Sequence, residues 1–272
     1  MSGASPVSAD LLGTIVAATR RTIEYREAET PLAALEAQIR RRPRSGQFAA
    51  ALRSSEPPRV IAECKRRSPS RGILRSAYEP ASHAVAYARA GAAAISVLTE
   101  PAFFDGSLEH LADVSAAVDV PLLRKDFIVS RYQLAEAAAA GADAVLLIVG
   151  ALDEGVLRDL IAAAGAFGLA TLVEVHDRAE LDRAVQAGAS IVGVNSRNLR
   201  TLTVHPEVLE ELASDIPRDV LAVAESGIRS RSDLDRFGAL GYHAFLVGER
   251  LITQDDPGAA LRELRGAGVE VR

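Results

Sequence analysis

The sequence predicts an α/β protein, a (β/α)8 TIM barrel with an N-terminal helical extension. Between residues 59 and 265, short β-branched runs alternate with alanine-rich stretches of helical spacing, which is the pattern of consecutive βα units. Eight runs of each kind can be counted, and eight strands close a barrel. Several strand-like runs end in a charged or polar side chain. A barrel that collects its active site from the ends of many strands explains these side chains.

The predicted strands have the mostly apolar composition of parallel strands that are buried on both faces. They lie at residues 59–65, 93–98, 120–125, 143–149, 169–175, 190–195, 219–225 and 243–248. The predicted helices lie at residues 80–90, 107–117, 130–140, 153–167, 177–187, 206–214, 230–239 and 257–266.

A regular series of glycines supports this assignment. Gly91, Gly141, Gly188 and Gly241 each follow a helix and precede an even-numbered strand, where glycine can end the helix in the left-handed conformation. Their intervals of 50, 47 and 53 residues indicate a repeated unit of two βα pairs.

Residues 1–58 do not follow the alternation, and we expect a helical extension packed on a catalytic barrel that spans residues 59–272. Asp10–Arg26 and Pro31–Arg42 have helical spacing, and Phe48–Leu52 can form a third short helix. The Pro57-Pro58 pair marks the end, because proline stops a helix and extends the residue before it. We expect the extension to plug the barrel or cover its helices; a lid over the active site is the alternative.

Composition narrows the class of protein. A length of 272 residues suits a single barrel, and no uncharged apolar run is long enough for a transmembrane helix. The start lacks a basic segment followed by an apolar one, so no secretory signal is expected. The single cysteine, Cys64, allows no intrachain disulfide and suits the cytoplasm. A net charge of -5 with interleaved acids and bases disfavours nucleic acid as a partner.

Alternation along the strands predicts which side chains face the barrel interior. Glu63 and Lys65 share a face with Ile61, whereas Cys64 points outward and is expected to pack as an inert thiol. The same parity turns further residues inward from the third, fifth and seventh strands: Leu123, Lys125, Phe127, Leu172, Glu174, Val223 and Glu225. Three carboxylates and two lysines at one mouth should shift one another's pKa values and favour acid–base chemistry. Glu225 could equally be a supporting carboxylate that orients a lysine.

An ordered series of motifs, one per strand end, resembles the indole-3-glycerol phosphate synthase family. Glu63–Gly72 (ECKRRSPSRG) resembles the family signature E-x-K-R-x-S-P-S-x-G. The other segments, in the family's order, are Leu98–Glu100 with Phe104–Ser107, Leu123–Val129, Leu146–Val149, Leu172–His176, Gly193–Leu199, Ala224–Ile228 and Leu246–Glu249. The resemblance covers the barrel from about Val60 to Leu251. Cys64, where Val or Ile is common, and Glu249, where some relatives have Ser, are mild departures. The second weakens a side-chain contact with phosphate but not a backbone contact.

The resemblance implies closure of an indole ring. The substrate would be 1-(2-carboxyphenylamino)-1-deoxyribulose 5-phosphate, and the products indole-3-glycerol phosphate, carbon dioxide and water. The ring carbon that bears the carboxylate attacks the ketone, carbon dioxide leaves, and a hydroxyl leaves as the pyrrole ring forms. The transient iminium accepts the decarboxylation electrons, so no cofactor is implied. The histidines (His83, His110, His176, His205 and His243) lack metal-ligand spacing, so we expect no metal.

The family pattern also implies catalytic roles for four residues. Lys125 would be the general acid, with a pKa lowered by neighbouring cations and partial burial. Glu174 would handle the dehydration proton, and Glu63 would sit beside the iminium. Lys65 would anchor the substrate carboxylate and could share the acid role.

The remaining implied roles are in binding. Ser68 and Arg197 would hold the substrate carboxylate, and Asn195 a ribulose hydroxyl. The rest of the substrate-binding set is Ser70, Phe104, Phe127, Leu199 and Glu225, with the two phenylalanines on the anthranilate ring. The phosphate would bind at Ser226, Gly227, Gly248 and Glu249, because barrels commonly build a phosphate site after strands seven and eight. Ser70 and Lys65 could reach the same phosphate. We expect this substrate to be a small-molecule partner of the protein, and we expect no nucleic-acid or membrane partner. The protein itself is expected to be cytoplasmic and a monomer or weak homodimer.

Two alternatives stand beside this interpretation. A phosphoribosylanthranilate isomerase would need one acid and one base, which gives no reason for two lysines together with two glutamates. A barrel that has lost activity and serves as a scaffold should show broken strand-end chemistry, whereas every charged position is filled here.

Overall fold

The computed structural model describes residues 11–39, 44–199 and 201–266, and within them eight parallel strands form a closed barrel. Around the barrel the strands run in the order β1-β10-β9-β8-β7-β6-β5-β4, with β1 paired to β4. They are β1 (Val60–Cys64), β4 (Ala94–Leu98), β5 (Leu122–Lys125), β6 (Ala144–Ile148), β7 (Ala170–Val175), β8 (Ile191–Asn195), β9 (Leu221–Glu225) and β10 (Ala244–Val247). Each lies within its predicted range, and the predicted (β/α)8 TIM barrel is confirmed.

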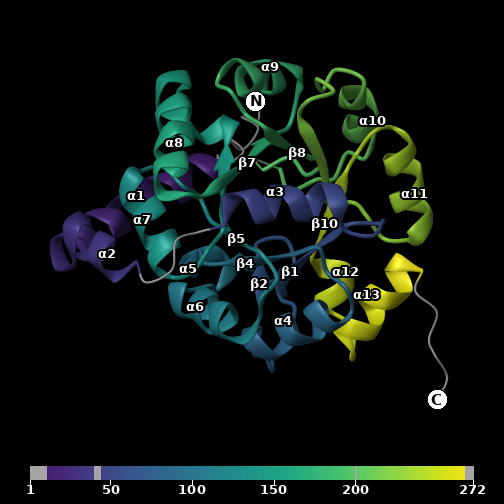
Figure 1. The fold of residues 1–272 in the computed structure, drawn as a ribbon, viewed down its shortest axis with the longest axis horizontal. Coiled ribbons are helices and arrows are strands. Elements are labelled where there is room, and N and C mark those ends of the chain that lie inside the picture. Colours follow the sequence, from purple (N-terminus) through teal and green to yellow (C-terminus); the bar gives the residue numbers. More distant parts are fainter. Residues whose placement is uncertain (1–10, 40–43, 200, 267–272) are drawn as a thin grey trace, which may run out of the picture.

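Eight helices follow the strands and surround the barrel (Figure 1). They are α4 (Pro80–Arg89), α6 (Leu108–Ala117), α7 (Arg131–Ala139), α8 (Glu154–Phe167), α9 (Arg178–Gln186), α10 (Glu207–Ala213), α11 (Arg231–Ala239) and α13 (Pro257–Arg265). Gly91, Gly141, Gly188 and Gly241 have φ of 83°, 90°, 88° and 107°, which confirms their predicted left-handed conformation.

The structure adds short elements that the sequence pattern did not predict. They are the ribbon β2 (Arg67–Ser68) with β3 (Gly72–Ile73), helix α5 (Pro101–Phe104), the 3-10 turn η1 (Val149–Ala151) and helix α12 (Glu249–Ile252). All follow the carboxyl end of a barrel strand, where the expected active site lies. Elements of two to four residues are too short to show a hydrophobic period.

Three helices precede the barrel: α1 (Leu11–Glu29), α2 (Leu32–Gln38) and α3 (Ser45–Ser54). Helix α3 lies across the centre of the ring of strands (Figure 1), and its Phe48 and Leu52 are fully buried in the same apolar cluster as Ala94 and Ile191. Ala94 and Ile191 are the first residues of β4 and β8, so α3 plugs the amino-terminal end of the barrel. The expected helix residues Asp10 and 40–42 lie outside the described residues. The division of the chain at residue 58 into two domains stays a prediction.

Two separate apolar clusters confirm the predicted alternation. Ile61, Leu123 and Leu172 belong to the cluster inside the barrel, whereas Val60 and Cys64 belong to the layer between strands and helices. Cys64 is fully buried, and burial together with the nearby Glu63 carboxylate raises the pKa of its thiol. Cys64 therefore packs as a small apolar residue, as expected. No helix among the described residues is long and apolar enough to cross a bilayer.

Candidate active site

A cavity of about 570 Å³ opens at the carboxyl ends of the barrel strands. Every residue that the sequence assigned to the site lines this cavity: Glu63, Lys65, Ser68, Ser70, Phe104, Lys125, Phe127, Glu174, Asn195, Arg197, Leu199, Glu225, Ser226, Gly227, Gly248 and Glu249. Among the described residues that line it, none comes from α1–α3, but Leu12 and Ile15 of α1 belong to the same apolar cluster as Phe127, and α1 packs against η1 at this end of the barrel. The alternative of an N-terminal lid therefore stays a prediction. The structure therefore brings these residues together, and their roles in binding and catalysis stay predictions.

Two lysine–glutamate pairs occupy the floor of the cavity. Lys65 Nζ lies 2.5 Å from Glu63 Oε1, and Lys125 Nζ lies 2.9 Å from Glu174 Oε2. A third carboxylate, Glu225, has its Oε2 3.6 Å from Lys125 Nζ. Lys65 and Lys125 are the only lysines in a sequence with 31 Lys and Arg residues. Arginine stays protonated in proteins while lysine can titrate, so both cations able to exchange a proton lie in this cavity.

The expected low pKa of Lys125 is wrong for this structure. Burial lowers the pKa of Lys125, but the carboxylates of Glu174, Glu225 and Glu63 outweigh burial and raise the pKa above its ordinary value. The expectation assumed that other cations flank Lys125, whereas its nearest charged neighbours are carboxylates. Lys125 is consequently protonated at neutral pH and gives up its proton less readily than an ordinary lysine.

Glu174 and Glu225 are two buried carboxyl groups that hold different charges. Burial raises the pKa of Glu174, but Lys125, His176 and Asn195 outweigh it, and the net pKa lies well below the ordinary value. Burial and the Glu174 carboxylate raise the pKa of Glu225 to about 8, against the opposing effect of Lys125. Near neutral pH the site therefore holds an ionised Glu174 beside a protonated Glu225. Pairs of carboxyl groups whose pKa values are pushed apart mark acid and base positions.

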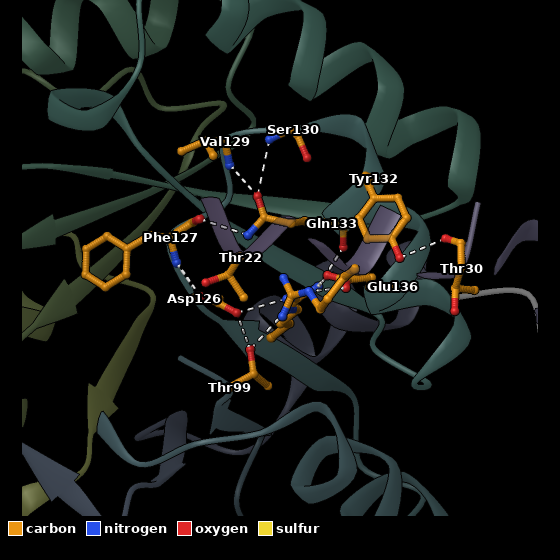
Figure 2. A network of polar contacts seen from close by, with 12 residues as sticks. Thr22, Thr30, Thr99, Asp126, Phe127, Val129, Ser130, Tyr132, Gln133 and Glu136 are labelled. Atoms are coloured by element: carbon orange, nitrogen blue, oxygen red, sulfur yellow. Dashed lines mark hydrogen bonds and ion pairs between the residues drawn. The ribbon is translucent and has the colours of Figure 1, made fainter. Parts of the chain in front are cut away.

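A buried polar network fixes the strand end that carries Lys125 (Figure 2). The Arg124 side chain, fully buried, points away from the cavity and donates to Asp126 Oδ2 at 2.9 Å and to Glu136 Oε2 at 3.1 Å. Asp126 Oδ1 accepts the N–H of Phe127 at 2.8 Å, and Gln133 Nε2 donates to the Phe127 carbonyl at 3.0 Å. These hydrogen bonds and ion pairs connect β5 to α7. They therefore fix the backbone on either side of Lys125 and at Phe127.

The network also reaches the N-terminal helices and β4. Arg26 of α1 forms an ion pair with Glu136, with Nε 2.9 Å from Oε1. Thr99, which follows β4, accepts from Arg124 Nε at 3.1 Å and donates to Asp126 Oδ2 at 2.6 Å. The sequence analysis gave no role to Arg26, Thr99, Arg124, Asp126 or Glu136, because none of them lines the cavity.

The aromatic pair comes from the segments that follow β4 and β5, whereas the glycine loops follow β9 and β10. The rings of Phe104 and Phe127 have centroids 6.3 Å apart and an interplanar angle of 39°. The Glu100 carboxylate caps α5 by accepting the N–H groups of residues 102, 103 and 104, which fixes the turn that presents Phe104. Leu98, Leu146, Ile148 and Leu246 give the cavity further apolar lining. This part of the cavity can hold a flat apolar ring.

The two glycine loops turn backbone groups toward the cavity. Ser226 and Gly227 have φ of 66° and 74°, and this left-handed conformation is strained for serine. Gly248 precedes α12, so the first N–H groups of that short helix lie beside the cavity. Loop N–H groups and helix N-termini of this kind bind anions.

Three arginines that the sequence assignment missed also line the cavity: Arg71, Arg229 and Arg250. Arg71 forms an ion pair with Glu249, so the one acidic side chain in the expected phosphate site is neutralised. Arg229 and Arg250 follow the Ser226-Gly227 and Gly248 motifs within a few residues, and this proximity was the signal that could have found them. Other cavity residues not predicted are Pro69, Leu202, Val204, Ile228, Val247 and Thr253. Among the described residues, no group of three or more His, Cys, Asp or Glu side chains could hold a metal ion.

This barrel has lysines, buried carboxylates and anion-binding loops at one mouth. These features indicate a (β/α)8 enzyme that transfers protons on an anionic small molecule. Comparison with known proteins narrows this class. The family model of indole-3-glycerol phosphate synthase matches residues 12–264. Indole-3-glycerol phosphate synthases from Parafrankia sp. (strain EAN1pec) and Nocardioides sp. (strain ATCC BAA-499 / JS614) are each 50% identical to this chain. They cover 94% of it, and the matches span 96% and 98% of their own lengths. The chain belongs to the indole-3-glycerol phosphate synthase family.

It is thus a decarboxylating lyase that closes the indole ring in tryptophan biosynthesis. More distant solved structures share the fold alone. A 3-hexulose-6-phosphate synthase has a TM-score of 0.61 at 16% identity, covering 76% of this chain and 98% of that one. A thiamine phosphate pyrophosphorylase from Pyrococcus furiosus has a TM-score of 0.58 at 19% identity, covering 76% and 94%.

Proposed function

We propose that Lys125 is the general acid of ring closure. In this step the ring carbon that bears the carboxylate forms a bond to the ketone carbon, and the ketone oxygen takes a proton from Lys125 Nζ. The observation that carries the proposal is the position of this ammonium between Glu174 at 2.9 Å and Glu225 at 3.6 Å. Glu225, whose raised pKa of about 8 keeps it protonated near neutrality, can return a proton to Lys125 after the transfer.

The other pair, Lys65 and Glu63, is assigned to decarboxylation. Lys65, with Ser68 and Arg197, binds the substrate carboxylate, and Glu63 stabilises the iminium that forms after ring closure. The bond between the ring and the carboxylate then breaks, carbon dioxide leaves, and the bonding electrons neutralise the iminium nitrogen. The present 2.5 Å contact between Lys65 and Glu63 supports this assignment, because it places an ammonium and a carboxylate side by side for substrate groups of opposite charge.

Glu174 is assigned to the final dehydration. As an ionised carboxylate it removes the proton from the carbon beside the leaving hydroxyl, and that hydroxyl leaves as water with a proton from Lys125, which Glu225 has reprotonated. Asn195 would hold a ribulose hydroxyl, and Phe104 and Phe127 would pack on the anthranilate ring, with Leu199 beside them.

The phosphate is assigned to the loops at Ser226-Gly227 and Gly248-Glu249, with Ser70 within reach. Arg71, Arg229 and Arg250 support this assignment, because they add positive charge at the cavity wall formed by those loops. We also assign the enzyme to the cytoplasm, as a monomer or weak homodimer without nucleic-acid or membrane partners. Its single buried cysteine is consistent with the cytoplasm, and its net charge of -5 is consistent with the absence of a nucleic-acid partner.

The test uses the fluorescence of the indole product, because the chain has no tryptophan to obscure it. Lys125→Ala should abolish turnover with an unchanged circular dichroism spectrum. Lys125→Arg keeps the positive charge and loses the acid, so its kcat should also stay at least about a hundredfold below wild type. Near-normal kcat in folded Lys125→Arg would show that charge alone suffices and would end the general-acid assignment.

Glu174→Gln tests the dehydration role separately, because glutamine keeps the volume of the side chain but cannot accept a proton. We expect kcat to fall by about a hundredfold or more with a small change in KM. A change confined to KM would make Glu174 a binding residue.

A further inference from the structure

His176 lies directly behind Glu174 and has no place in the chemistry described so far. It follows the last residue of β7 and precedes α9, and its side chain is 16% exposed. It does not line the cavity, so it cannot contact the substrate. Its imidazole faces the Glu174 oxygen that Lys125 does not use.

The imidazole is held between two carboxylates. His176 Nε2 lies 3.4 Å from Glu174 Oε1, and Nδ1 lies 3.0 Å from Glu180 Oε2. Glu180 Oε2 also accepts the backbone N–H of His176 at 2.8 Å. The Glu180 N–H in turn donates to the helix cap Asp177 at 2.8 Å, so the orientation of Glu180 is fixed by α9. Nδ1 forms a hydrogen bond with Glu180, whereas Nε2 and Glu174 Oε1 lie within ion-pair distance and neither has a hydrogen-bond partner. A carboxylate beside each ring nitrogen favours the doubly protonated imidazolium, in which both nitrogens donate.

The surroundings agree with a cation at His176. Burial lowers the pKa of His176, but Glu174 and Glu180 outweigh burial and raise the pKa to about 10. The charged groups facing the pair are Glu180 from α9, Lys125 from β5, Glu225 from β9 and, through Lys125, Glu63 from β1. Turn η1 packs against both β7 and α9 and consists of Val, Gly and Ala, none of which titrates.

The imidazolium contributes, after Lys125, to the difference between Glu174 and Glu225. Both carboxyl groups are buried and both lie near Lys125. Only Glu174 has a second cation, His176, and only Glu174 has a lowered pKa. Glu225 lacks such a partner, lies farther from Lys125 at 3.6 Å, and has its pKa raised to about 8 by burial and by the Glu174 carboxylate.

We propose that His176, held by Glu180, is a positioning residue that keeps Glu174 as the anionic base of the site and leaves the shared proton on Glu225. The proposal rests on the dehydration role assigned to Glu174. In this proposal a residue outside the cavity, His176, determines that Glu174 is the base and Glu225 is the acid, although the two carboxyl groups are otherwise similar.

The test is the pH dependence of kcat in His176→Leu and His176→Gln. Glutamine keeps an N–H donor but loses the charge, and leucine loses both. Without the imidazolium, Glu174 loses one of the groups that lower its pKa, so the pH below which kcat falls by about tenfold per pH unit should lie higher in both variants than in the wild type. The KM should change little. His205→Gln is the matched control, because His205 forms an exposed pair with Glu207 at the same 3.0 Å and should leave the profile unchanged.

Profiles of both variants that fall at the same pH as that of the wild type would overturn the proposal, as would a change in KM alone. If Glu174→Gln is inactive while the His176 variants keep the wild-type profile, only this inference fails. If Glu174→Gln keeps its kcat, the proposed dehydration role fails first.

A measurement on the unmodified enzyme guards against variants that fail to fold. Nitrogen-15 NMR of labelled histidine should find one imidazole of the five that stays doubly protonated beyond pH 9. An enzyme in which every imidazole is neutral by pH 8 would refute the inference.

Discussion

Replacement of Gly193 by alanine should displace Glu225. Gly193 lies in the middle of β8 and pairs with Glu174 on one side and Val223 on the other. A Cβ atom built there would lie 2.0 Å from Glu225 Oε1, 3.1 Å from Glu225 Cδ and 3.2 Å from Leu172 Cδ1. The Glu225 carboxyl therefore occupies the space that a side chain at position 193 would need.

The size of the effect follows from these distances. A carbon–oxygen contact of 2.0 Å must open by about 1 Å or more to become tolerable, and the carboxyl is buried with little room to move. Overpacking of this kind costs about 1–3 kcal/mol of stability. For a chain of this length that lowers Tm by roughly 2–5 °C. The kcat should fall as well, because the shift moves Glu225 relative to Lys125.

The assay is a double-mutant cycle of Tm and kcat with Glu225→Ala. In the Glu225→Ala background the clash is gone, so Gly193→Ala should then lower Tm by less than about 2 °C. Gly165→Ala is the control, because a Cβ there meets nothing within 4 Å and should not destabilise the protein. An equal loss of Tm in both backgrounds would refute the reasoning and place the strain in the β8 backbone.

Three further predictions concern the support of the site. Gly248→Ala places a Cβ 2.3 Å from Glu63 Oε1, so steady-state kinetics should show a lower kcat as well as a higher KM; a rise in KM alone would mean that Glu63 is undisturbed. Arg124→Met leaves Glu136 and Asp126 without their buried partner, at a cost of about 3–5 kcal/mol, and thermal unfolding should show the loss; an unchanged Tm would contradict the structural role of the network. Cys64 should react with a thiol reagent only after unfolding, since it is fully buried; rapid labelling of the native enzyme would contradict its position.

The sequence alone determined the barrel and which candidate residues meet at its carboxyl-terminal mouth. A strand period of two and a strict order of elements are local properties, so the positions of Glu63, Lys125 and Glu174 followed from parity without any contact being known. The glycines before the even-numbered strands were predictable for the same reason, since a left-handed residue is a local requirement.

Only the tertiary structure decided the charges within the site. The sign of the pKa change at Lys125 depends on which charges lie within a few ångströms of Nζ, and three strands from distant parts of the chain supply those carboxylates. The proton on Glu225 and the imidazolium at His176 likewise arise from contacts across β7, β9 and α9. Coulombic interactions depend on distance in space and on burial, and neither is written in the spacing of residues along the chain.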